Sequence, residues 1–426
     1  MQINRKNTFS GEVFHLLRGV AITFAICLFG YFLLVVVYCL PTGPMEKNVL
    51  DSCRIFSEEG VYPELTGIKT SQVDNSTDAL MLLIASYPSM ENVWKAAAGV
   101  ERYRVEGKDP VETLLYIYEE DGKDFEHVSY SRYWHGYLVF LKPLLGLFDY
   151  GGIRFVLMLF QLSLFLLIVL KLANKRKELI FPIFFMWLFM NPIATMSSLQ
   201  FNNVTLVTWI AILLMVYLEE QWKMELSKWE LLFVVIGVLT SYLDLLTYPL
   251  VTLGVPLSLW LALNRDSSMG FKIKGILLIS VFWSIGYAGM WAGKWVLGSI
   301  ITGENVFENA VEVMQVRTSS IVEEDQGVTY WEVIECQMSI AGRYMFLAVA
   351  AAGAFLTFYS VKMKKLDFQS FFPYVIVGLY PFIWYLILKN HSYIHAFFTY
   401  RELAITIFAC CVYIAVQCKR KGDHQL

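Results

Sequence analysis

The chain has 426 residues, of which 57% are hydrophobic and only 17% are charged. Soluble domains have about 45–50% apolar and about 25% charged residues, so this composition excludes an ordinary soluble protein. The net charge of −3 favours no particular partner, and we expect none among nucleic acids.

Runs of about 20 apolar residues recur along the chain, and each is long enough to cross a hydrocarbon core of about 30 Å. They predict an all-α polytopic membrane protein, a single integral membrane domain over residues 1–426. We expect about ten transmembrane helices, at 17–40, 152–173, 179–196, 204–218, 230–243, 247–263, 275–297, 341–361, 372–388 and 402–417. The first run is too long for the apolar part of a signal peptide, so we expect it to be retained.

Lys and Arg residues predict the orientation. They gather at the N-terminus, in alternate short connections and in the C-terminal tail, and a ten-helix count places all these groups on one side. The positive-inside rule makes that side cytoplasmic. We therefore expect a plasma-membrane protein with both termini in the cytoplasm. Its first extracytoplasmic loop, at 41–135, would carry amphipathic helices, and a second loop would lie at 298–340.

Three carboxylates in the first loop are candidate catalytic groups. Asp74 and Asp78 lie four residues apart and would share one face of a helix. Either could act as a general base, and the pair could bind a divalent metal through its oxygens. The alternative is that Asp74 or Thr77 only caps a helix that begins here. Asp51 is the third candidate, with an ordinary surface position as its alternative.

His391, His395 and Arg401 lie between the last two apolar runs. The spacing of the two histidines suits a metal pair on a helix, but only two ligands are visible locally. The better interpretation is a phosphate clamp, because Arg401 offers a bidentate fork to phosphate oxygens. The alternative is a buried structural network.

Three further polar residues stand at the ends of apolar runs. Asp244 lies where an unpaired charge is costly, so we expect either a functional role or an Arg partner. Arg132 and His135 close the first loop beside aromatic residues, and they would either join the C-terminal cluster or anchor the membrane interface.

Several familiar motifs are absent from the sequence. It contains no Walker loop, dinucleotide fingerprint, GxSxG, HExxH or CxxC pair, so ATP-driven transport, soluble redox chemistry and serine hydrolysis lack support. Cys53 and Cys336 are the only cysteines in the predicted outer loops, and a disulfide between them is compatible with the sequence.

The order of these features resembles the GT-C fold of integral membrane glycosyltransferases, such as the protein O-mannosyltransferases and oligosaccharyltransferases. The run from Arg132 to Phe148, followed by Ile153-Arg154, is similar to a stretch of that fold that begins His-Pro-Pro. This chain has no Pro-Pro after His135 and no plain Asp-Glu pair in the first loop. The resemblance implies a polyprenyl-phosphate sugar as donor and a first-loop carboxylate as the catalytic group.

Four segments also resemble a group of uncharacterised multi-pass membrane proteins of Gram-positive bacteria. They are 74–78, 133–136, 244–249 and 391–401. This likeness covers most of the chain and implies no activity.

The sequence therefore predicts a glycosyltransferase that moves a sugar from a polyprenyl-phosphate donor to a cell-surface glycan acceptor on the outer face. One first-loop carboxylate would deprotonate the acceptor, and His391, His395 and Arg401 would hold the lipid phosphate. The alternative function is a transporter or flippase for a lipid-linked saccharide, because helix breaks at Pro192 and Pro249 could line a transport site. A non-catalytic subunit of an envelope complex is a third possibility.

Overall fold

A computed structural model of the chain describes residues 5–88, 92–222, 225–323, 326–342 and 368–422. The described part is almost entirely helical, and its four strands form two small antiparallel pairs. This confirms an all-α polytopic membrane protein. Within the described residues, seven helical segments are long and apolar enough to cross a membrane, namely Val13–Tyr38, Tyr150–Lys175, Leu199–Trp222, Leu226–Leu243, Met269–Thr302, Gln369–Ile387 and Ala396–Gln417.

The other predicted spans differ from this set. The run at 179–196 forms two short helices, α8 (Ile180–Phe189) and α9 (Pro192–Ser197), because Asn191 adopts a positive φ of 60° and caps α9. The run at 247–263 forms α12 (Val251–Leu263), whose 13 residues make it about 20 Å long. The predicted span at 341–361 lies almost wholly outside the described residues.

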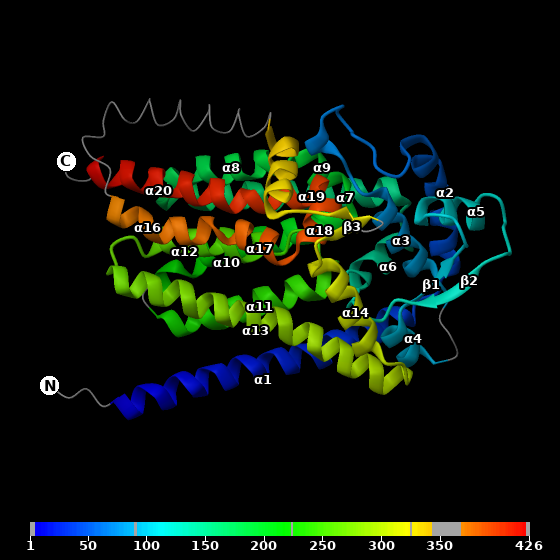
Figure 1. Ribbon diagram of the computed structural model, residues 1–426, viewed down its shortest axis with the longest axis horizontal. Helices are drawn as coiled ribbons and strands as arrows, with labels where there is room; N and C mark the ends of the chain where they lie inside the picture. Colours follow the sequence, from blue (N-terminus) through cyan, green and yellow to red (C-terminus); the bar gives the residue numbers. More distant parts are fainter. Residues whose placement is uncertain (1–4, 89–91, 223–224, 324–325, 343–367, 423–426) are drawn as a thin grey trace.

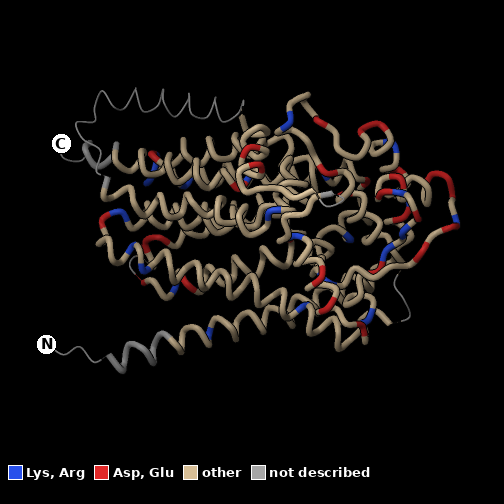
Figure 2. Tube along the Cα trace, in the orientation of Figure 1, with Lys and Arg blue, Asp and Glu red and all other residues tan. Residues whose placement is uncertain are grey.

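The helices of the seven apolar segments run side by side, and the start of α1 (Arg5–Tyr38) and the end of α20 (Ala404–Gly422) lie at the same end of the bundle (Figure 1). They are α1 (Arg5–Tyr38), α7 (Tyr150–Lys175), α10 (Leu199–Trp222), α11 (Leu226–Leu243), α13 (Met269–Thr302), α16 (Phe368–Gly378), α17 (Tyr380–Ile387) and α20 (Ala404–Gly422). Charged residues lie mainly toward the two ends and are sparse in between (Figure 2). This distribution suits a bundle whose middle faces hydrocarbon.

The 41–135 loop forms a compact cap at the end opposite the termini (Figure 1). Its elements are α2 (Gly43–Glu59), the short 3-10 turn η1 (Lys69–Ser71), α3 (Asn75–Ser86), α4 (Val93–Gly99), β1 (Glu101–Arg104), α5 (Pro110–Tyr118) and β2 (Glu126–Ser129). Apolar faces of α2, α3 and α5 pack together, and α6 (Leu138–Leu145) returns the chain to the bundle. The cap is therefore a folded body, and its hydrophobic core continues into apolar residues of α1, α11 and α13.

The second loop, at 298–340, and the segment 389–403, which we call the C-terminal hairpin, complete the same end of the bundle. They contain α14 (Val306–Thr318), the pair β3 (Ile321–Glu323) and β4 (Gln326–Gly327), α18 (Lys389–Ile394), α19 (Ala396–Thr399) and the turn η3 (Tyr400–Leu403). Lys142 and Lys294 are buried and donate to Ala85 O and Ala98 O, each at 2.7 Å. They satisfy carbonyls in the last turns of α3 and α4 and so fix the cap on the bundle.

Glycines bring α11 and α13 into close contact. A Cβ on Gly237 would meet the α13 backbone at Trp283, and one on Gly286 would meet the α11 backbone at Val234. Small residues allow helices in a membrane to approach this closely. This contact helps to position two parts of the molecule: α11 leads directly into the loop at Asp244, and α13 carries aromatic residues that line a groove beside that loop.

Candidate functional site

A small polar pocket lies where the 41–135 cap meets the C-terminal hairpin. It has a volume of about 80 Å³. It is lined by Asp74, Thr77, Leu80, Tyr130, Tyr133, Gln200, Leu245, Arg317, His391, His395 and Phe398. We call this the polar pocket. Segments far apart in the chain thus place a carboxylate, a guanidinium and two imidazoles around one cavity.

Asp74 is both a helix cap and a pocket residue. Its Oδ1 accepts from Thr77 N at 2.9 Å and its Oδ2 from Thr77 Oγ1 at 2.7 Å, which starts α3. The side chain is 4% exposed, and burial raises the pKa of Asp74 to about 6. A carboxyl with a pKa near neutral suits general acid–base chemistry. The two interpretations offered by the sequence are therefore compatible.

His391 points into the pocket with both ring nitrogens lacking a well-formed hydrogen bond, although the backbone of Leu246 lies near the ring. His391 is 3% exposed. Burial, and then the neighbouring His395 and Arg317, hold the pKa of His391 well below its usual range. Buried polar groups are normally satisfied, so a neutral imidazole with free nitrogens indicates a place for a polar ligand.

Arg317 is the cation of this pocket, and the sequence interpretation missed it. The residue lies in the last turn of α14, and its Nη1 donates to His395 Nε2 at 2.8 Å. Burial and this charge lower the pKa of His395 to about 3, so both histidines are neutral. One signal existed in the sequence: Arg317 is the only Lys or Arg between 298 and 340.

An apolar groove of about 400 Å³ adjoins the polar pocket. It is lined by Arg132, Tyr133, Leu246, Tyr287, Ala288, Trp291, Trp295, Ala310, Val313, Met314, Arg317, Thr318, Trp384, Ile387 and Leu388. Tyr133 and Arg317 line both cavities, so the guanidinium stands at their junction. The volume and the apolar lining of the groove suit a hydrocarbon chain.

Leu246 lines the apolar groove in an uncommon backbone conformation, and its neighbour Leu245 lines the polar pocket. The φ of Leu246 is 69°, a region that non-glycine residues rarely occupy. Asp244 braces this turn: its carboxylate accepts from Thr247 N at 3.0 and 3.1 Å and from the Thr247 hydroxyl. Burial raises the pKa of Asp244 to about 6. The structure therefore places Asp244 behind the pocket wall, with no Arg partner among the described residues.

Asp78 is fully buried and does not line the pocket. It accepts from Tyr150 Oη at 2.6 Å, Leu199 N at 2.9 Å and Gln200 N at 3.1 Å. These bonds cap the start of α10 and fix the backbone of Gln200, a residue that lines the pocket. Burial raises the pKa of Asp78.

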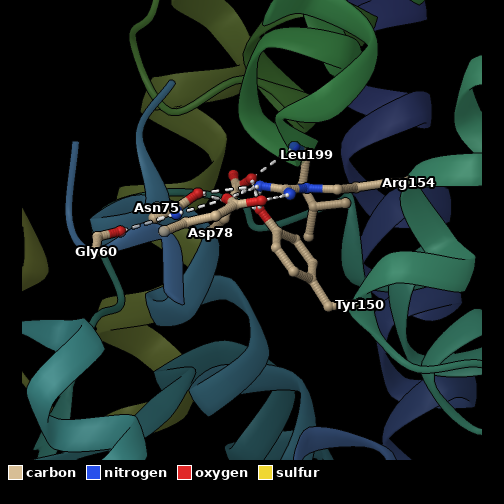
Figure 3. Close-up of polar contacts among 7 residues, drawn as sticks. Gly60, Asn75, Asp78, Tyr150, Arg154 and Leu199 are labelled. Atoms are coloured by element: carbon tan, nitrogen blue, oxygen red, sulfur yellow. Dashed lines mark hydrogen bonds and ion pairs between the residues drawn. The ribbon is translucent and has the colours of Figure 1, made fainter. Parts of the chain in front are cut away.

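Arg154 and Asn75 belong to a hydrogen-bond network next to Asp78, and Tyr150 Oη connects them to it. Arg154 forms a bidentate pair with Glu59 at 2.7 and 3.0 Å and donates to Asn75 Oδ1 at 3.1 Å (Figure 3). Asn75 in turn donates to Gly60 O at 2.8 Å. The network joins α2, α3 and α7, so it holds the start of α3 in place.

Arg401 is fully buried and does not line the polar pocket. Each of its three guanidinium nitrogens donates to a backbone carbonyl: Nε to Met190 O at 2.8 Å, Nη2 to Thr70 O at 3.0 Å and Nη1 to Phe397 O at 3.1 Å. The guanidinium also packs on the ring of Phe201, with 4.5 Å from Cζ to the ring centre. Arg401 thereby holds Thr70 of η1 in place, and Thr70 lies four residues before Asp74.

The remaining predicted residues lie in three settings. His135 is buried; its Nδ1 forms a hydrogen bond with Tyr137 Oη at 2.9 Å, and its Nε2 donates to Tyr130 O at 3.0 Å. Arg132 lines the apolar groove. Asp51 is exposed on α2 and lines neither cavity. Thus Asp74, His391 and His395 line the polar pocket, and Arg132 lines the adjoining groove.

No group of three or more His, Cys, Asp or Glu side chains within the described residues could hold a metal ion. Cys53 and Cys336 are both free thiols rather than a disulfide.

Comparisons with known proteins add no identity. No family model, no curated protein and no solved structure matches the chain. Fold and site together define an all-α polytopic membrane protein with a polar pocket and an adjoining apolar groove at one end of its bundle.

Proposed function

We propose that the protein is a membrane glycosyltransferase that moves a sugar from a polyprenyl-phosphate donor to a cell-envelope acceptor on the outer face. One observation carries the proposal: Arg317 lines both the apolar groove and the polar pocket that contains Asp74. A lipid-linked phosphate has this pattern of chemistry, with a hydrocarbon chain, an anionic junction and a polar group beyond it.

In the proposed reaction the lipid chain occupies the groove and the phosphate lies at Arg317. Asp74 accepts the proton of an acceptor hydroxyl as that oxygen bonds to the anomeric carbon of the sugar. The bond between the anomeric carbon and the phosphate oxygen breaks, and the lipid phosphate leaves with the electron pair. Arg317 stabilises the negative charge that grows on the phosphate. A single displacement of this kind inverts the configuration at the anomeric carbon.

The neutral histidines support this chemistry in different ways. His391 has free ring nitrogens and can donate a hydrogen bond to the phosphate or a sugar hydroxyl. His395 accepts from Arg317 and so orients the guanidinium without competing for its charge. A neutral partner leaves the full positive charge of Arg317 for the ligand.

The test is release of lipid phosphate by purified protein. We would incubate the protein in nanodiscs with an undecaprenyl-phosphate hexose and envelope glycan fragments, and measure undecaprenyl phosphate and glycan product by mass spectrometry. Transfer that is lost in Asp74→Asn and Arg317→Gln supports the proposal. A protein that forms no product but moves a fluorescent lipid-linked hexose across liposome bilayers is a flippase, and the proposal then fails.

A further inference from the structure

Three arginines gather around Tyr130 and Tyr133, beside the junction of the groove and the polar pocket. The Cζ atom of Arg132 lies 4.4 Å from the ring centre of Tyr130 and 5.5 Å from that of Tyr133. Arg102 lies over the same Tyr130 ring at 5.7 Å. Arg317 joins them through Tyr133, because both residues line both cavities.

None of these arginines forms an ion pair with a carboxylate among the described residues. Their bonds go to neutral acceptors instead. Arg132 donates to Asn309 Oδ1 at 3.1 Å, Arg102 to Tyr103 O at 3.4 Å, and Arg317 to His395. The Nε atoms of Arg102 and Arg132 are buried without a hydrogen-bond partner.

Two other partly buried arginines pair with carboxylates, whereas the fully buried Arg401 has a backbone carbonyl at each guanidinium nitrogen. Arg154 pairs with Glu59 at 2.7 Å, and Arg176 pairs with Glu219. Burial lowers the pKa of Arg102, and the positive charges of Arg104 and Arg132 add to that effect. Like charges held together without counterions destabilise a fold, so the arrangement indicates an anion with more than one charge.

A single phosphate needs only one of these arginines. Arg317 reaches the polar pocket, whereas Arg132 lines only the groove, toward the place of the lipid chain. We propose that the site takes a lipid diphosphate, with the sugar-linked phosphate at Arg317 and the lipid-linked phosphate at Arg132. Arg102 adds positive potential from behind Tyr130. The inference rests on the proposed function, because it assigns the groove to the lipid chain of the donor.

The experiment compares geranylgeranyl diphosphate with geranylgeranyl monophosphate as binding probes. We would measure binding to the protein in phosphatidylcholine nanodiscs, without any transfer step. Charge-assisted hydrogen bonds to a second phosphate should make the diphosphate bind about 10-fold to 100-fold tighter. Arg132→Gln should remove that preference and leave monophosphate binding unchanged, and Arg317→Gln should weaken both probes.

Arg104→Gln is the matched control. Arg104 lies two residues from Arg102 on β1, is exposed, and pairs with Glu126 at 2.7 Å. It should leave both affinities unchanged. Thermal melting of each variant checks that it is folded.

Three results would overturn the inference. Equal affinity for the two probes means a monophosphate site, and the glycosyltransferase proposal then still stands. An equal loss of both probes in Arg132→Gln means that Arg132 acts only on the fold. Equal displacement of both probes by phosphatidylglycerol means that the arginines bind any anionic headgroup. If neither probe binds the parent protein, the proposed function fails as well.

Discussion

The guanidinium of Arg317 donates a hydrogen bond to Nε2 of His395 at 2.8 Å, so His395 must accept through that nitrogen. An imidazolium cannot accept, and protonating His395 would therefore both break this bond and place two positive charges together. The pair joins α14 to the C-terminal hairpin across 78 residues of sequence. It fixes the guanidinium at the junction of the polar pocket and the apolar groove.

This pair predicts how stability depends on pH. The pKa of His395 is lowered to about 3 in the fold, whereas an unfolded histidine titrates near about 6.5. The unfolded chain therefore binds more protons between these values, and the stabilisation is complete above about pH 6.5 and is lost as the pH falls toward 3. His395→Gln, which keeps an acceptor, should flatten this part of a plot of melting temperature against pH. An unchanged slope would show that other groups cause the loss.

Asp74→Asn should separate stability from activity. Asparagine is as good a helix cap as aspartate, so α3 should still form. The raised pKa of Asp74 means that its ionised form is disfavoured in the fold, so the carboxylate costs stability above about pH 6 and costs none below about pH 4. The variant should melt higher than the parent at pH 7 and equally at pH 4.

The same substitution should lower transfer by about 10²-fold to 10⁴-fold, the usual loss of a general base. The parent rate should fall as the pH drops below about 6, because Asp74 becomes protonated. Asp78→Asn is the comparison variant, since that carboxylate caps α10 away from the pocket. An Asp74→Asn protein with parental activity would remove Asp74 from the reaction.

The sequence predicted the general architecture because the positions and lengths of apolar runs follow directly from the order of the residues. It overestimated the lengths of the helices now seen as α8 and α12, because apolar content does not show where a helix ends. Asn191 breaks the first by adopting a positive φ, and the Asp244 turn shortens the second. Both breaks were visible in the sequence as interruptions, but their effect on helix length depends on tertiary packing.

The candidate site was predicted in part, and its roles stay predictions. Asp74, His391 and His395 share one pocket, as a site built from the cap and the C-terminal hairpin requires. Arg401 lies elsewhere because η3 turns its side chain toward carbonyls in the interior. Arg317 could not be placed from local pattern, because its position depends on how α14 folds back onto α18.

Arg401 should behave as a structural residue rather than as a ligand. Arg401→Gln would leave carbonyls of Met190, Thr70 and Phe397 without their donor, at about 1–3 kcal/mol for each unsatisfied group. We expect a large fall in melting temperature and poor yield. Arg317→Gln, at a half-buried position, should melt like the parent and lose binding of geranylgeranyl phosphate. If Arg401→Gln instead melts like the parent and loses binding, while Arg317→Gln melts early and still binds, then Arg401 is the phosphate-binding residue.

Cysteine labelling tests the orientation. Lys123 lies in the 41–135 cap and Lys175 at the other end of the bundle, and both side chains are largely exposed. If both termini are cytoplasmic, a membrane-impermeant maleimide added to intact cells should label Lys123→Cys and not Lys175→Cys, relative to the parent chain. Permeabilised cells should show labelling of both. Labelling of Lys175→Cys alone in intact cells would invert the topology and place the pocket inside the cell.

The groove predicts a defect that depends on the lipid chain. Ala288 faces it from α13, next to Tyr287 and Trp291. Ala288→Trp should fill space that a hydrocarbon chain needs and so weaken geranylgeranyl diphosphate by about tenfold or more, since each buried methylene contributes about 0.8 kcal/mol. Inorganic pyrophosphate has no chain, and its binding should not change.

Leu277→Trp is the matched control, because Leu277 lies on the same helix and is 63% exposed. It should bind both probes like the parent. If Ala288→Trp weakens pyrophosphate as much as the lipid diphosphate, the substitution has displaced Arg317 rather than blocked a chain. If it weakens neither probe, the hydrocarbon chain lies outside the groove, and Arg317 then binds a phosphate that enters from another side.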